Sequence, residues 1–294
     1  MGNSIKTIFN NIKYRDSLSQ LIIVNVAVFL VIGLLRVFAV LFELQTPDLQ
    51  AYIEVSSNIG TTAKHIWVLF TYMFVHYEIL HILFNMLMLY WFGRIFLTYF
   101  TPKNLVALYV LGGLAGALFY ILTFNTIPYF LKMNPSSMIG ASASVMAIIF
   151  GAAFYNKDQE VMMLLFGRVK IIYIAIFIFV LDFLALGGSS NVGGHIAHIG
   201  GALIGYYYAI QYRKGKDITR WINLLIDKIV NLFKAKPKMR VTRNNYNSKD
   251  DASYNQRKHS ESLEVDRILD KIKQSGYNSL NDDEKKRLFD ASNK

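Results

Sequence analysis

The feature that most constrains this chain is a series of apolar runs close to the length of a membrane-crossing helix. A helix needs about 20 residues to cross the hydrocarbon core of a bilayer. The first run, 21–42, is interrupted only by Arg36 and is too long for the core of a signal peptide, so we predict a retained first span. Five further runs follow at 77–99, 105–124, 142–155, 171–186 and 195–212. The sequence therefore predicts an all-α polytopic membrane protein built as a six-helix bundle.

The composition supports this fold class. Of the 294 residues, 53% are hydrophobic and 17% are charged, and the mean hydropathy is +0.31. A soluble domain carries about a quarter charged residues, so these values exclude an ordinary soluble globule, a disordered chain and a coiled coil. The chain has no cysteine, which excludes disulfides, thiolate metal sites and a cysteine nucleophile.

Basic residues orient the predicted spans, because cytoplasmic loops of membrane proteins are rich in Lys and Arg. The N-terminus and the loops after the second and fourth runs carry eight of them: Lys6, Lys13, Arg15, Arg94, Lys103, Lys157, Arg168 and Lys170. The opposite loops carry Lys64 and Lys132, with Arg36 near that side. We therefore expect both termini in the cytoplasm, and the second, fourth and sixth spans to begin at the outer face.

The chain divides into four predicted parts. These are a cytoplasmic segment at 1–20, the membrane domain at 21–212, an amphipathic helix (221–233) with a basic linker (234–260) at 213–260, and two short helices (263–273 and 282–290) at 261–294. Asn281 with Glu284 three residues later is typical of a helix start. From Arg213 onward, 20 Lys/Arg and 12 Asp/Glu leave +8 of the net charge of +11. We interpret this tail as lying beside anionic lipid, without a nucleic-acid partner, since the positive-inside bias alone produces such an excess.

Three clusters of polar residues interrupt the apolar runs, and polar groups inside a membrane are functional candidates because burying them is costly. By the predicted topology, all three lie at the outer ends of the second, fourth and sixth spans. The clusters are His76, His81 and Asn85; Gly140-Ala-Ser142-Ala-Ser144; and His195-Ile-Ala-His198-Ile-Gly-Gly201. His81 and Asn85 are four residues apart, so they share one helix face.

The spacing of small residues predicts which helices pack together. His198 shares a helix face with Gly201 and Gly205, and glycines at this spacing let two helix backbones approach closely. The fourth span offers a matching stripe of small residues at Ala143, Ala147 and Gly151. We expect this packing to bring His198 within hydrogen-bond reach of Ser142, which is what a serine–histidine pair requires.

The fourth span is also short. Its 14 residues make about 21 Å of helix, whereas the hydrocarbon core is about 30 Å thick. Ser142 is therefore expected several ångströms below the outer surface, where a water-filled cavity must surround the polar segment that leads into the helix. A hydrolase needs such a cavity, because water must reach its site.

These residues resemble the rhomboid family of intramembrane serine proteases, over about 67–208. The shared motifs lie on alternate spans: His76-x4-His81-x3-Asn85, Gly140-Ala-Ser142-Ala, and Ala197-His198-Ile-Gly-Gly201-x3-Gly205. The resemblance implies that Ser142 is the nucleophile and His198 the base, and that His81, Asn85 and the backbone amide of Ser142 form the oxyanion hole. His76, Gly140, Gly201 and Gly205 are then structural residues near the site.

The resemblance also implies that the protein cleaves the transmembrane helices of other proteins near their outer ends, without a metal or other cofactor. It suggests a bacterial inner membrane as the location, with the site open to the outer side. Two positions depart from the family pattern. Ala143 follows the nucleophile where glycine is usual, and Met146 stands where some members place an aromatic ring against the histidine.

Three alternative assignments fit the sequence less well. Ser144 is a competing nucleophile but lacks a glycine two positions before it. His195 and His198 suggest a metal site, yet the zinc motif His-Glu-x-x-His is absent. Asp182 is the only carboxylate in spans 3–6, which disfavours an aspartyl protease.

Three further polar residues are expected to have structural roles and no part in catalysis. Asp182 is expected to bond a neighbouring helix, His195 to face the outer water, and His76 to tie the first loop to the second span. A non-proteolytic rhomboid-like protein that binds transmembrane helices remains the alternative function, and the oligomeric state is left open.

Overall fold

The computed structural model describes residues 16–44, 50–163, 167–188, 191–233 and 248–292. The chain divides into two compact units, Met1–Lys234 and Ala235–Lys294. The predicted N-terminal segment, 1–20, and the predicted linker, 234–260, fall partly outside the described residues.

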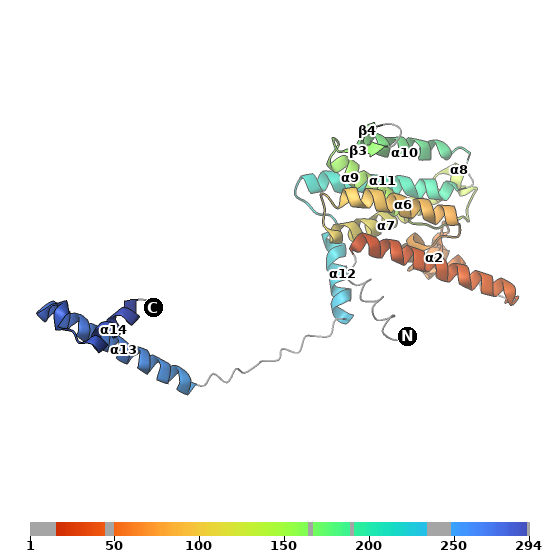
Figure 1. Ribbon diagram of the computed structural model, residues 1–294. Helices are drawn as coiled ribbons and strands as arrows, with labels where there is room; N and C mark the ends of the chain where they lie inside the picture. Colours follow the sequence, from red (N-terminus) through yellow and green to blue (C-terminus); the bar gives the residue numbers. More distant parts are fainter. Residues whose placement is uncertain (1–15, 45–49, 164–166, 189–190, 234–247, 293–294) are drawn as a thin grey trace. The chain divides into compact units, whose positions relative to one another are not determined.

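Within the described part of the first unit, six helices occupy the six predicted runs, with ends that shift by a few residues. They are α2 (Ser17–Leu41), α6 (Ile79–Phe96), α7 (Pro102–Thr126), α9 (Ser142–Tyr155), α10 (Ile171–Ala185) and α11 (Val192–Arg213). The helix starts follow local chemistry: the Asp16 carboxylate accepts the Ser19 N–H at 2.7 Å, and Pro102 opens α7 after the capping residue Thr101. The short α9 lies among α6, α7, α10 and α11 (Figure 1).

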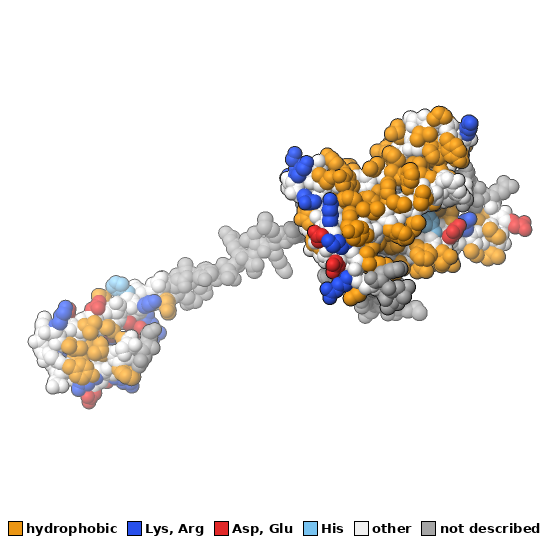
Figure 2. Space-filling model, turned by 90° about the horizontal axis from the view of Figure 1, so that it is seen from above, with side chains coloured by type: hydrophobic (Ala, Val, Ile, Leu, Met, Phe, Trp, Pro, Cys, Tyr) orange, Lys and Arg blue, Asp and Glu red, His pale blue; other side chains and the backbone are white. Residues whose placement is uncertain are grey.

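The outer surface of this unit is apolar. Among the described helices, α2, α6 and α7 are long and apolar enough to cross a membrane, and α9 and α10 are shorter apolar helices. Only three of the 25 residues of α2 are buried, and Leu34 on this helix is 69% exposed. Figure 2 shows apolar side chains over much of one face, with Lys and Arg gathered at one end. The protein is an all-α polytopic membrane protein, as the sequence predicts.

The tightest helix contact joins α9 and α11. A Cβ atom on Gly201 would lie 2.1 Å from the carbonyl oxygen of Ala143, and one on Gly205 would lie 2.3 Å from that of Ala147. No side chain fits at these distances, so the two backbones touch because these positions are glycine. The close packing predicted from the small-residue stripes is confirmed.

The connections hold the start of α9 in place. The segment between α2 and α6 contains α3 (Gln50–Ile53), β1 (Val55–Ser56), α4 (Ile59–Lys64), α5 (Val68–Thr71) and the 3-10 helix η1 (Tyr72–Phe74). After α7 come α8 (Pro128–Leu131) and β2 (Ser137–Met138), and β2 pairs antiparallel with β1. The Ser137 hydroxyl also donates a hydrogen bond to Glu54, so the polar lead-in to α9 is fastened to the first loop. A hairpin of β3 (Glu160–Met163) and β4 (Gly167–Lys170) joins α9 to α10.

The predicted amphipathic helix is α12 (Arg220–Phe233), which packs on α7 through an ion pair of 2.8 Å between Lys103 and Asp227. The second unit holds α13 (Ser248–Ser275), the 3-10 helix η2 (Tyr277–Ser279) and α14 (Asp282–Ser292). The predicted helix start at Asn281 is confirmed, since its side chain accepts the Glu284 N–H at 2.7 Å and Glu284 accepts the Asn281 N–H at 2.9 Å. A hydrogen bond from Lys271 also lowers the pKa of Glu284.

The first helix of this unit is longer than the sequence predicts. We expected a short helix at 263–273 preceded by a linker, but α13 begins at Ser248. Residues 248–262 lack the apolar spacing used to locate helices, yet they contain no glycine or proline. Because no glycine or proline interrupts this stretch, the helix that is anchored at the buried Ile268 continues toward the N-terminus.

Candidate active site

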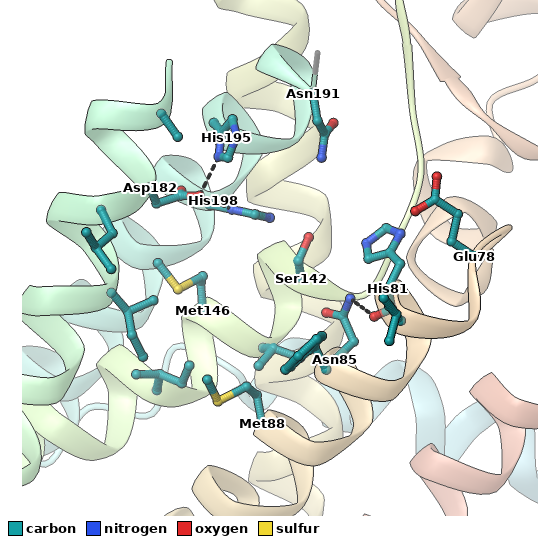
Figure 3. A pocket seen from close by; sticks show the side chains of 17 residues that line it. Glu78, His81, Asn85, Met88, Ser142, Met146, Asp182, Asn191, His195 and His198 are labelled. Carbon is teal, nitrogen blue, oxygen red and sulfur yellow. Dashed lines mark hydrogen bonds and ion pairs between the residues drawn. The ribbon is translucent and has the colours of Figure 1, made fainter. Parts of the chain in front are cut away.

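The three polar clusters of the sequence meet around one cavity of about 540 Å³. Its walls come from α6, α9, α10 and the start of α11, and most of the lining is apolar (Figure 3). The polar lining residues are Glu78, His81, Asn85, Ser142, Asp182, Asn191, His195 and His198. The structure thus brings Ser142, His198, His81 and Asn85 to the same cavity.

Ser142 is the first residue of α9, and the backbone before it is held on both sides. Gly140 has a φ of +115°, a conformation that favours glycine, and its N–H donates to the Tyr72 carbonyl at 3.0 Å. The next amide, at Ala141, donates to His76 Nε2 at 3.3 Å. The first N–H groups of a helix have no intrahelical partner and lie at the positive end of its dipole. The start of α9 therefore offers a hydroxyl and backbone donors at one place.

Two side chains of α6 stand beside this helix start. Asn85 is 8% exposed, and its Nδ2 donates one hydrogen bond to the His81 carbonyl at 2.9 Å. An amide nitrogen has two hydrogens, so a second donor remains for the cavity, where Asn85 lies next to Ser142 (Figure 3). The His81 ring rests against Gly140, because a Cβ there would be 2.9 Å from His81 Cε1. Glycine at 140 therefore makes room for the imidazole.

His198 approaches Ser142 from α11. Its Nδ1 lies 2.8 Å from Asp182 Oδ1, and its Nε2 is buried without a hydrogen-bond partner among the described residues. The ring points toward Ser142 across the cavity (Figure 3). No hydrogen bond joins Nε2 to the Ser142 hydroxyl among the described residues, so the bond expected from the sequence is not formed in this structure. In enzymes without substrate, a base and its hydroxyl are often farther apart than in the reacting complex.

One expectation about a single histidine needs correction. His195 does not face the outer water: its Nδ1 lies 2.5 Å from Asp182 Oδ1, and its side chain is 16% exposed. The cause is α10, which places the carboxylate against α11. His76, in the loop before α6, contacts the second span as expected, since its ring centroid lies 5.0 Å from that of His81, and its Nε2 also accepts the Ala141 N–H before α9. The expectation that Asp182 bonds a neighbouring helix is confirmed, but the sequence did not identify the two histidines as its partners.

Asp182, His195 and His198 are also the residues that could hold a metal ion, since one ligand atom from each lies within 4.8 Å of the others. Two ligand atoms bound to one tetrahedral zinc ion, each about 2.0–2.1 Å from it, are about 3.3 Å apart. The two nitrogen–oxygen distances here are 2.5 and 2.8 Å. They match hydrogen bonds better than a metal cage.

Comparison with known proteins is consistent with this arrangement. A family described as "Rhomboid domain" matches residues 63–215, just over half of the chain. The chain belongs to the rhomboid family. It is 29% identical over 215 residues to "RHOMBOID-like protein 12, mitochondrial" of Arabidopsis thaliana. The aligned region covers 69% of this chain and 60% of that relative. The chain thus spans about 60% of the length of this relative.

The rest of the chain has a match of its own. Residues 249–294 match a family of unknown function (DUF6576), a range that coincides with α13 and α14. The rhomboid match ends at residue 215, before α12 begins. The two matches therefore fall into the two compact units.

The positions where this rhomboid departs from the family pattern are buried. Ala143 lies in the contact with Gly201, and Met146, 4% exposed, lines the cavity one turn after Ser142. The alternative nucleophile, Ser144, is 0% exposed and has its Oγ 3.9 Å from Met73 Sδ, outside the cavity lining. Of these two serines, only Ser142 is therefore accessible from the cavity.

Proposed function

We propose that this rhomboid is a serine endopeptidase that hydrolyses peptide bonds in or near the transmembrane helices of other membrane proteins. The observation that carries the proposal is the presence, in one cavity, of the Ser142 hydroxyl and the unpartnered Nε2 of His198. The apolar lining of the cavity suits a substrate segment that leaves the bilayer.

The proposed reaction begins when His198 Nε2 takes the Ser142 proton. Ser142 Oγ then attacks the substrate carbonyl carbon, and the oxygen that gains negative charge faces the α9 amides and the Asn85 and His81 side chains. When the carbon–nitrogen bond breaks, Nε2 returns its proton to the leaving amine. Water, activated by the same imidazole, releases the acyl group from Ser142. The steps use these side chains, the α9 amides and water.

We further propose that the site opens to the outer side of a bacterial inner membrane, with both termini in the cytoplasm. The support is the distribution of Lys and Arg, which favours the cytoplasm for the loops after the second and fourth helices. The printed name of the relative above places that protein in mitochondria. Partners under this proposal are the lipid bilayer and helical membrane-protein substrates.

The test uses two serines that are two residues apart. Purified protein in detergent is treated with a fluorophosphonate probe and with a transmembrane reporter substrate. We expect Ser142→Ala to abolish both labelling and cleavage, whereas Ser144→Ala keeps most of both, because Ser144 lies outside the cavity. Full cleavage by Ser142→Ala would contradict the proposal. Wild-type protein that folds but neither labels nor cleaves would instead favour a non-proteolytic helix-binding protein.

A further inference from the structure

We propose that Asp182 is the positioning residue of His198, so that this rhomboid uses a serine–histidine–aspartate arrangement. The inference rests on the proposed function for its role in catalysis, but its geometry stands independently. Asp182 is on α10, His198 is on α11, and one hydrogen bond of 2.8 Å joins Oδ1 to Nδ1. No residue near Asp182 in the sequence explains why a carboxylate occupies this otherwise apolar helix.

The bond decides which nitrogen of His198 carries the proton. A carboxylate oxygen accepts hydrogen bonds, so Nδ1 must donate and therefore holds the hydrogen. In the neutral ring Nε2 then has a free lone pair, and Nε2 is the nitrogen without a partner among the described residues. This is the tautomer that a base for Ser142 needs, because a ring protonated on Nε2 alone could not accept the serine proton.

The carboxylate also stabilises the charge that forms during the reaction. When His198 takes the serine proton it becomes an imidazolium, and a negative oxygen at 2.8 Å lies beside it. The Asp182 side chain is 11% exposed and that of His198 is 16% exposed. In a mostly apolar and partly buried cavity such an interaction is screened less than in water. Asp182 therefore stabilises the His198 imidazolium more than the neutral imidazole.

His195 holds Asp182 from the other side. Its Nδ1 lies 2.5 Å from the same oxygen, Oδ1, and its ring lies 5.9 Å from that of His198 at an angle of 88°. The acceptor therefore has two donors one helical turn apart on α11, which fixes the carboxylate in one position. His195 lines the same cavity, and its bond to Asp182 gives it a part in orienting the carboxylate.

The arrangement accounts for Met146. A thioether side chain is flexible and gives no fixed surface against which an imidazole can stack. With methionine in this place, another group must set the angle of the His198 ring. The bond from α10 does so directly, since it fixes both the position of Nδ1 and the direction in which Nε2 points.

The experiment measures the tautomer and the rate in full-length protein in detergent. Nitrogen-15 NMR spectra of histidine-labelled protein report which ring nitrogen is protonated. The His198 signals are assigned as those that disappear in His198→Ala. We expect Nε2 of His198 to be unprotonated in the wild type. Asp182→Ala removes the acceptor, so the Nε2-protonated form should appear. We also expect kcat for a reporter substrate to fall by roughly 100-fold, with KM unchanged within about twofold.

Two further variants separate the role of the carboxylate from general damage. Asp182→Asn keeps the shape of the side chain but adds an amide N–H that can donate to Nδ1, so we expect the Nε2-protonated tautomer to appear and kcat to fall. The matched control is Asp158→Asn, which removes an exposed ion pair with Lys170 of 2.6 Å and should change neither tautomer nor kcat. Thermal unfolding of each variant identifies any that does not fold, and the near-isosteric Asp182→Asn then carries the test.

An unchanged tautomer and rate in folded Asp182→Ala would overturn the proposal. Loss of activity on treatment with a chelator, restored by zinc, would overturn it in favour of a metal site at Asp182, His195 and His198. If the wild type shows the expected tautomer but neither labels nor cleaves, the positioning contact stands and the proposed protease function fails. The two proposals therefore fail in distinguishable ways.

Discussion

The proposed part of Asn85 in catalysis depends on one N–H of its side-chain amide. One hydrogen of its amide is used within α6, and the side chain lines the cavity together with Ser142. We predict that Asn85→Ala lowers kcat by roughly 10- to 1,000-fold, the usual range for the loss of one oxyanion-hole donor. Fluorophosphonate labelling should persist at a reduced rate, since the backbone donors at the start of α9 remain.

The control for this measurement is Asn223→Ala on α12, which changes the same side chain away from the cavity. It should leave kcat unaltered. A rate for Asn85→Ala equal to that of the wild type would remove Asn85 from the mechanism.

The two histidines of α11 are predicted to differ. Both bond Asp182, but only His198 points toward Ser142. His198→Ala should therefore lose cleavage and probe labelling together. His195→Ala should keep activity within about tenfold, which corresponds to about 1.4 kcal/mol of transition-state stabilisation. Reporter cleavage measured for both variants decides this, and an essential His195 with a dispensable His198 would mean that the register of α11 is misread.

The sequence was sufficient to predict that the candidate residues meet at one place but not to find all of their partners. Ser142, His81, Asn85 and His198 could be found because polar groups in apolar runs are rare and because alternate spans begin at one face. The bond between Asp182 and the α11 histidines could not be predicted. Apart from Asp182, α10 is apolar on every side, so the sequence gives no preferred face and no rotation of this helix against α11.

Among the helix contacts, that between α9 and α11 gives the clearest test of packing. A Cβ on Gly205 would lie 2.3 Å from the Ala147 carbonyl oxygen, so Gly205→Ala must push the two backbones apart. Overpacking of this kind costs about 1–3 kcal/mol. Because α11 carries His198, we expect a lower unfolding temperature in detergent and slower labelling of Ser142.

Gly33→Ala on α2 is the matched control, since a Cβ there meets nothing within 4 Å. Its unfolding temperature should equal that of the wild type or exceed it slightly. Equal behaviour of Gly33→Ala and Gly205→Ala would show that the α9–α11 contact tolerates more space than the structure gives it.

At the same scale, helix positions were more predictable than helix lengths. Apolar runs located α2, α6, α7, α9, α10 and α11 because helices inside a bilayer consist mainly of apolar residues, even where, as in α9 and α10, they are shorter than a full crossing. The polar N-terminal part of α13 and the β3–β4 hairpin have no such constraint. Their backbone hydrogen bonds depend on local propensity and on neighbours, which the apolar pattern does not reveal.

At the scale of the whole molecule, the chain separates the candidate chemistry from the charged tail. The cavity uses residues 78–198, whereas most of the positive charge follows Arg213. From His198 to the end of α11 there are 15 residues, or about 22 Å of helix. The proposed site and the start of the tail are therefore at opposite ends of α11, which under the proposed topology are opposite sides of the membrane.

A chain that ends after Lys238 keeps the first compact unit and α12 but lacks α13 and α14. Under the proposed topology no residue of the missing unit can reach the outer face, so catalysis should not depend on it. We predict that this truncated protein cleaves a detergent-solubilised reporter and labels at Ser142 within about twofold of the full-length rates. The truncated Ser142→Ala variant supplies the background. A truncated protein with the full-length unfolding temperature but no cleavage would show that the second unit is needed for the reaction itself, since a unit that only recruits substrates or regulates in the cell would leave this assay unchanged.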